Sequence, residues 1–199
     1  MSFHLSAWLS ANYIELAGAI LGIAYIYFSI RQHILTWITG LLTSLLYIVV
    51  FYQTKFYADM GLQFYYVAIS IYGWYLWKSK KPGLTEKTNL PVIHARRNFF
   101  LISAMATWII FLLIRFILVR YTDSMIPNMD AATTALSITA TYMLARKMIE
   151  HWIIWVVVDV VSAGLYIYKG LWATSLLFLV YTLMAVIGYK QWKNELLRQ

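Results

Sequence analysis

The chain has 199 residues, of which 62% are hydrophobic and 12% charged, and its mean hydropathy is +0.67. Soluble domains are about half apolar and about a quarter charged, so this composition excludes an ordinary soluble protein and indicates a membrane protein. The absence of cysteine excludes disulfides and thiolate chemistry. The net charge of +8 lies mostly in short loops, so we interpret it as a signal of membrane orientation and not as a nucleic-acid surface.

Seven segments are apolar and long enough to cross a bilayer as helices, which takes about 20 residues each. In chain order they lie near 14–30, 34–54, 58–77, 99–119, 130–145, 150–168 and 171–190. A long polar stretch at 78–98 separates the third segment from the fourth. We therefore expect a first three-helix part at 1–78, a loop with a linker helix at 79–120, and a second three-helix part at 121–199.

The two three-helix parts form an internal repeat. Residues 15–78 align with residues 130–193 at a constant offset of 115 without gaps, and about a dozen of the 64 pairs are identical. The identical pairs include Arg31/Arg146, Trp37/Trp152, Tyr66/Tyr181, Gly73/Gly188, Trp77/Trp192 and Lys78/Lys193. Chance similarity between two apolar segments does not explain matches of this kind on one offset.

The number of crossings fixes the relation between the repeats. The first and fifth helices lie four crossings apart, so they run in the same direction and the two triples are parallel. The expected fold class is an all-α integral membrane protein with seven transmembrane helices as 3+1+3 parallel repeats, a duplication like that of SWEET transporters. Transporters built from such repeats bind their substrate between the repeats near the middle of the membrane.

Basic residues are distributed unequally between the two ends of the helices. Twelve Lys and Arg residues fall in the first, third and fifth connections and the C-terminus, and three fall on the other side. Because basic loops stay in the cytoplasm, we expect the N-terminus outside and the C-terminus in the cytoplasm.

The sixth segment carries the most specific candidate site. Spacings of three and four place Trp152, Trp155 and Asp159 on one face of a helix, with Asp159 near the middle of its span. A carboxylate at that depth costs roughly 3 kcal/mol on insertion and is a functional candidate. Indoles beside a carboxylate suit a flat, cationic heteroaromatic ring. Two alternatives stay open: Trp152 belongs to the interfacial aromatic belt, or Asp159 pairs with an internal arginine or accepts structural hydrogen bonds. Arg115 is the arginine that could form such a pair, but we expect its side chain to extend outward to the interface.

The repeat shows which of these residues are specific to the second half. Trp152 aligns with Trp37, whereas Trp155 aligns with Gly40 and Asp159 with Ser44, which is a further candidate for binding the substrate. We therefore interpret the tryptophan pair as a shared scaffold, and we expect a site that has become asymmetric to bind an asymmetric ligand.

Further candidates lie on the third and fifth segments. Asp59, Gln63 and Tyr66 share one helix face, and Gln63 both donates and accepts hydrogen bonds, as an amide or sugar ligand requires. An interhelical hydrogen bond is an equally good interpretation of Gln63. Ser137 is a minor candidate for lining the cavity, because small polar residues also serve close helix packing. No metal-ligand set, P-loop or dinucleotide fingerprint occurs, so we expect no cofactor, no metal and no enzymatic activity.

Four sequence motifs stand out: the run Phe56–Gln63, Gly73 with Trp77, Trp152 with Trp155, and Gly188 with Trp192. Together they resemble the PnuC family of bacterial vitamin transporters. The resemblance covers about residues 12–193. It implies a SWEET-related duplicated fold in the bacterial inner membrane. It also implies uptake of nicotinamide riboside for NAD biosynthesis by facilitated diffusion, with thiamine or riboflavin as the substrate in other members. It further implies a cytoplasmic kinase that traps the substrate, and binding roles for Trp152, Trp155 and Gln63.

The residues alone leave the substrate open, since nicotinamide riboside and thiamine are both cationic. A non-transporting membrane scaffold is the alternative from another class, and an intramembrane carboxylate at Asp159 disfavours it. The expected partners are a small-molecule substrate and the lipid bilayer, without nucleic acid, and homo-oligomer formation is left open.

Overall fold

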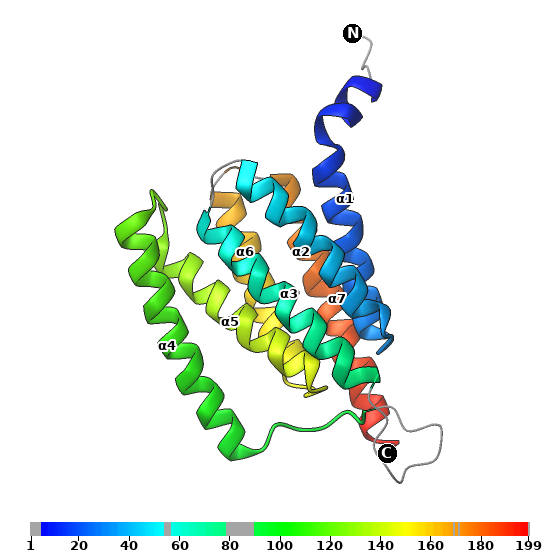
Figure 1. The fold of residues 1–199 in the computed structure, drawn as a ribbon. Helices are drawn as coiled ribbons and strands as arrows, with labels where there is room; N and C mark the ends of the chain where they lie inside the picture. Colours follow the sequence, from blue (N-terminus) through cyan, green and yellow to red (C-terminus); the bar gives the residue numbers. More distant parts are fainter. Residues whose placement is uncertain (1–4, 54–56, 79–89, 169, 171, 199) are drawn as a thin grey trace. The chain divides into compact units, whose positions relative to one another are not determined.

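The computed structural model describes the chain at 5–53, 57–78, 90–168, 170 and 172–198, and side chains at 17–52, 60–78, 90–168, 170, 172 and 174–198. It contains seven helices in these ranges, drawn from blue to red in Figure 1. They are α1 (Leu5–Ile30), α2 (Leu35–Gln53), α3 (Tyr57–Lys78), α4 (Arg97–Tyr121), α5 (Pro127–Ala145), α6 (His151–Tyr168) and α7 (Trp172–Leu196). The chain separates into two compact units, 1–74 and 75–199.

The seven helices confirm the all-helical prediction, with one correction at the N-terminus. Helix α1 begins at Leu5, well before the expected start near residue 14. The added segment contains no proline or glycine and several good helix formers, so nothing in it stops the helix. Within the described residues, four helices are long and apolar enough to cross a membrane: Leu35–Tyr52, Arg97–Tyr121, His151–Tyr168 and Thr174–Leu196. In α1, the part with described side chains is apolar over Ala17–Ile30.

The first unit depends on close approaches at glycine. The Tyr47 hydroxyl lies where a Cβ on Gly18 would stand, so α1 and α2 pack closely there. A Cβ on Gly40 of α2 would lie 3.2 Å from both the Tyr25 ring and the Ser70 hydroxyl oxygen. Small residues allow transmembrane backbones to come together in this way.

The turns that join the first two helices of each triple have the same geometry. Gln32 and Lys147, which are 115 residues apart, both have a φ of 53°. Each turn also has the same five backbone hydrogen bonds at that offset, among them Gln32 N to Ser29 O at 3.1 Å and Lys147 N to Leu144 O at 2.9 Å. A left-handed residue at the end of a helix reverses the chain and satisfies carbonyls that the helix leaves free.

Two side-chain arrangements recur at the same offset. The Trp37 ring occupies the place of a Cβ on Gly73, and the Trp152 ring lies 2.6 Å from a Cβ on Gly188. The Arg31 guanidinium lies 5.8 Å from the Tyr27 ring centre, and Arg146 lies 5.9 Å from the ring of its own tyrosine, Tyr142. The aligned residues therefore have the same local structure in both halves, whereas the symmetry axis that relates the halves stays a prediction.

In the second unit, a segment before α4 is fastened to the turn between α5 and α6. Ile93 N donates to Lys147 O at 3.0 Å, and Ile149 N donates to Ile93 O at 3.0 Å, which makes a parallel β-bridge. The Glu150 carboxylate accepts from Ala95 N at 3.0 Å and lies 2.8 Å from Nδ1 of His94. These contacts fix the end of the segment from which α4 starts.

Candidate functional site

Asp159 lies on the buried face of α6, where it is 4% exposed. Within the described residues, its carboxylate has no hydrogen bond and no salt bridge. Buried charges in proteins are normally paired or bound to a ligand, because an isolated carboxylate loses its hydration. The environment of Asp159 therefore suits a carboxylate whose counter-charge comes from a bound ligand.

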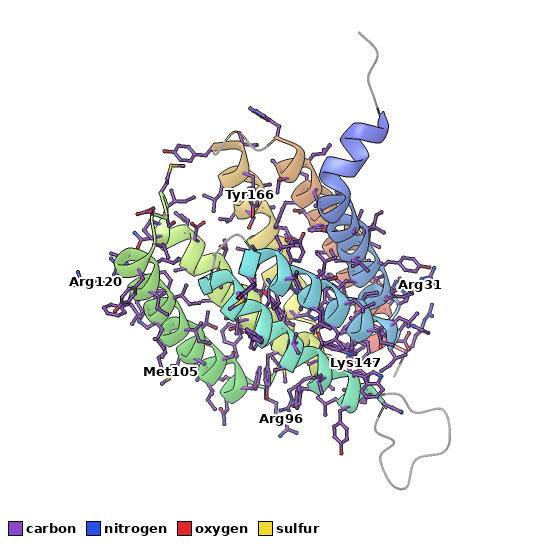
Figure 2. All side chains as sticks on the ribbon, turned by 45° about the horizontal axis from the view of Figure 1, so that its top comes forward. Arg31, Arg96, Met105, Arg120, Lys147 and Tyr166 are labelled. Atoms are coloured by element: carbon purple, nitrogen blue, oxygen red, sulfur yellow. The ribbon has the colours of Figure 1, made fainter. Side chains whose placement is uncertain are left out.

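Trp155 precedes Asp159 by one helical turn and is half-buried. Two further polar residues continue the same face at spacings of three and seven from Asp159: buried Ser162 and half-buried Tyr166. The Tyr166 ring lies 5.0 Å from the ring of Phe178 on α7, and Figure 2 labels it among the side chains of this unit. Ser162 and Tyr166 were not among the residues predicted for the site, although their spacing from Asp159 places them on its helix face.

Trp152 is a packing residue in this structure. It is 3% exposed, and its ring lies 4.5 Å from His151 and 5.7 Å from Trp192 on α7. Trp37, its counterpart in the first unit, is 1% exposed and covers Gly73. This burial agrees with the interpretation of the pair as scaffold and leaves Trp155 as the more accessible indole of the motif.

The first-half candidates lie in their own unit. Ser44 is 4% exposed and donates to Gly40 O at 2.9 Å. Gln63 and Tyr66 on α3 are half-buried, and the Tyr66 ring lies 5.5 Å from Tyr65. The side chain of Asp59 lies outside the described residues. The structure thus does not test a common site for the candidates of the two halves.

Ser137 on α5 is 9% exposed, and its hydroxyl donates to Thr133 O at 2.8 Å. Its own carbonyl accepts from the Thr141 hydroxyl at 2.8 Å. Hydroxyls bonded back to their own helix are typical of small residues that let helices pack closely. A ligand contact from Ser137 would require this bond to be shared.

Arg115 does not neutralise Asp159. Its Nε donates to Oδ1 of Asn128, at the start of α5, at 2.7 Å, and the side chain is exposed. The alternative of an internal Arg115–Asp159 pair is therefore wrong in this structure. Asp130, in the first turn of α5, accepts from the Ser124 hydroxyl at 2.7 Å, which is a structural role for an acid at a helix N-terminus.

The turn before α6 holds a buried lysine. Lys147 is 2% exposed, and its ammonium lies 4.7 Å from the centre of the Trp77 ring. The Trp77 indole N–H donates to Ala145 O at 3.0 Å. Burial lowers the pKa of Lys147 to about 8, and the charge of Glu195 opposes this shift. Figure 2 labels this lysine.

The arrangement on α6 can bind a cation and does not resemble a metal centre. A half-buried indole lies one turn from a carboxylate that has no partner among the described residues, and the two offer an aromatic face and a counter-charge. In the described part of the chain, no group of three or more His, Asp or Glu side chains could hold a metal ion.

Comparison with known proteins identifies the family to which the chain is related. The sequence profile described as "Nicotinamide mononucleotide transporter" matches residues 12–194. The chain is 26% identical to the nicotinamide riboside transporter PnuC of Escherichia coli (strain K12), over 92% of this chain and 86% of that protein. It is 26% identical to the riboflavin/roseoflavin transporter RibM of Streptomyces davaonensis, over 89% of this chain and 83% of RibM. The crystal structure of the vitamin B3 transporter PnuC has the same fold, with a TM-score of 0.74, 23% identity, and coverage of 96% of this chain and 85% of that chain.

The fold and the related proteins define the class of this protein as a multi-pass inner-membrane transporter for a small molecule. The family is one of transporters and not of enzymes. Within that class, the chain belongs to the nicotinamide mononucleotide transporter family, and its PnuC relatives confirm the resemblance found in the sequence motifs.

Proposed function

We propose that this protein takes up a flat, cationic vitamin precursor, nicotinamide riboside, across the inner membrane. The observation that carries the proposal is the buried Asp159 carboxylate, which lies without a partner among the described residues on the same helix face as Trp155. A pyridinium ring supplies the charge that this carboxylate lacks and a face for the indole to stack on. The PnuC relatives, which are nicotinamide riboside transporters, favour the riboside.

Thiamine is the second candidate substrate, because it is also a cationic heteroaromatic compound and Asp159 does not discriminate between the two. The riboflavin of the RibM relative has a neutral ring, so an unpaired carboxylate gives it no charge-based advantage. A scaffold without transport remains the less favoured alternative, since an unpaired buried carboxylate destabilises a purely structural protein.

We assign the substrate contacts to Trp155 and Asp159, with Ser162 and Tyr166 next to them on α6. Trp152 supports α6 through its packing on α7. Ser44, Gln63, Tyr66 and Ser137 stay predicted contributors, each to be tested by substitution.

We propose facilitated diffusion with alternating access, followed by trapping through a cytoplasmic kinase. Helix α1 begins at Leu5, so Glu15 lies within this helix and not at its N-terminus. Asp159 is the acid that we expect near the middle of the sixth span, and a proton relay needs a second acid close to it. The orientation with a cytoplasmic C-terminus and the division into 1–78, 79–120 and 121–199 as parallel repeats around a linker helix belong to this proposal.

A binding titration of the purified protein tests the substrate. We expect nicotinamide riboside to bind and riboflavin to bind most weakly. Thiamine should compete with the riboside if the site recognises only charge and ring shape. Tight binding of riboflavin without binding of either cation would contradict the assignment of Asp159 as the counter-ion.

A further inference from the structure

A groove in the second unit lies between α4 and the α5–α6 pair, away from the α6 face that carries Asp159. Its volume is about 530 Å³, and its walls include Phe100, Ala104, Phe111, Ala135, Leu136 and Ile154. Helix α4 packs along α5 and has no buried residue among its 25. Helix α4 is long and apolar enough to span the membrane, so its exposed side chains suit contact with acyl chains.

The polar atoms of the groove walls are bonded within the protein. Thr107 and Thr139 share a hydrogen bond of 2.6 Å across the α4–α5 contact. The Thr107 hydroxyl also lies 2.7 Å from Ser103 O, and the Ser103 hydroxyl donates to Phe100 O at 2.9 Å. These hydroxyls are thus satisfied without a ligand, and the surface that the groove presents is hydrocarbon, which suits an apolar occupant.

One end of the groove carries positive charge. Arg96 and Arg97 are exposed and precede Phe100, the first groove residue, by about one helical turn. The acid at this end, Glu150, has its carboxylate occupied by His94 and by the Ala95 N–H. Figure 2 places Arg96 and Arg120 at opposite ends of α4, with Met105 between them on the outer surface.

We propose that this groove binds an anionic phospholipid, with one acyl chain along α4 and the phosphate at Arg96 and Arg97. From Phe100 to Phe111 the groove follows α4 for about 16 Å at about 1.5 Å per residue. One leaflet of a hydrocarbon core that is about 30 Å thick has a similar depth, about 15 Å. Basic pockets beside transmembrane helices on the cytoplasmic side suit lipid headgroups. This proposal does not depend on the identity of the transported substrate.

Native mass spectrometry of the whole protein, with dioleoyl phosphatidylglycerol or dioleoyl phosphatidylcholine as the probe, tests it. We expect a retained phosphatidylglycerol adduct that Ala104→Trp removes by filling the groove. The matched control is Ala106→Trp, at an exposed alanine of α4 that does not line the groove. Replacing Arg96 and Arg97 together by Gln should weaken phosphatidylglycerol binding roughly tenfold or more, because each basic residue near anionic lipid contributes to affinity. Arg120→Gln should leave it unchanged.

Four results would overturn the proposal. Equal retention of phosphatidylcholine would remove the headgroup preference, and an undiminished adduct in Ala104→Trp would place the acyl chain elsewhere. Glycerol phosphate that binds as tightly as the phospholipid would indicate a site for the free anion alone. A change of oligomeric state in Ala104→Trp, with no change in lipid binding, would show that a second copy of the chain covers the groove.

Discussion

Replacing Asp159 by Asn separates the binding role of this residue from its cost to the fold. The side chain is 4% exposed and has no hydrogen bond or salt bridge within the described residues. Asn keeps the shape of the side chain and removes its charge, so the folded protein no longer buries an unpaired carboxylate. We therefore expect the stability of Asp159→Asn to be unchanged or raised while binding of a cationic ligand falls.

The size of the binding loss follows from the charge interaction. Opposite charges about 4 Å apart attract by about 4 kcal/mol at an effective dielectric constant of about 20. Desolvation and the hydrogen bonding that Asn retains offset part of this attraction, which leaves a net loss of about 1–3 kcal/mol. The dissociation constant for nicotinamide riboside should then rise about tenfold to a hundredfold.

The assay is a titration of purified wild type and Asp159→Asn with nicotinamide riboside and with its neutral dihydro form, which has the same ribose and carboxamide. The loss should be large for the cation and small for the neutral ring. Asp130→Asn is the matched control, because Asp130 lies in the first turn of α5, accepts from the Ser124 hydroxyl and should affect stability only. Unchanged binding of the cation by folded Asp159→Asn would refute the counter-ion argument.

Four further predictions concern packing, protonation and topology. Trp155→Ala should weaken binding of the cation by about 1–3 kcal/mol, whereas Trp37→Ala should lower the free energy of unfolding by about 3–5 kcal/mol. Equal binding losses in the two folded variants would contradict the assignment of Trp155 to binding and Trp37 to packing. Gly188→Ala should lower the thermal unfolding midpoint because its Cβ would lie 2.6 Å from the Trp152 ring, whereas Gly164→Ala, with open space at its Cβ, should not. Lys147 has a pKa of about 8 in the folded protein and an ordinary value of 10.5. The unfolded state therefore holds this proton more tightly, and the free energy of unfolding should rise between pH 8 and 10.5. Lys147→Gln, which introduces the residue found at the matching position Gln32, should remove that rise in melting curves. A reporter enzyme fused to the C-terminus should be active only in the cytoplasm, and activity only outside the cell would reverse the assigned orientation.

The sequence predicted the helices, and it paired residues 115 apart that have the same local structure, because both depend on local pattern. Runs of apolar residues about 20 long mark helices directly. The offset of 115 identified Trp37 with Trp152 and Gly73 with Gly188, and the structure supplies the physical reason, since each indole lies against its glycine. A bulky ring at a helix contact requires a residue without a side chain opposite it, so the two types occur together in both halves.

The features that the sequence did not reveal depend on contacts between distant residues. The β-bridge between Ile93 and Met148 joins a loop to a turn, and neither segment has a strand pattern. The start of α1 was misplaced because hydropathy marks the apolar part of a helix and not its end. Tyr166 belongs to the α6 face by spacing, but its contact with Phe178 on α7 requires the fold.

Flux of nicotinamide riboside into liposomes that contain only this protein tests the central claim most directly. We expect the internal substrate to reach the external concentration and stop there, with or without an imposed pH gradient. Accumulation should occur only when a riboside kinase and ATP are enclosed. Accumulation above the external concentration that is driven by a pH gradient, without the kinase, would contradict facilitated diffusion.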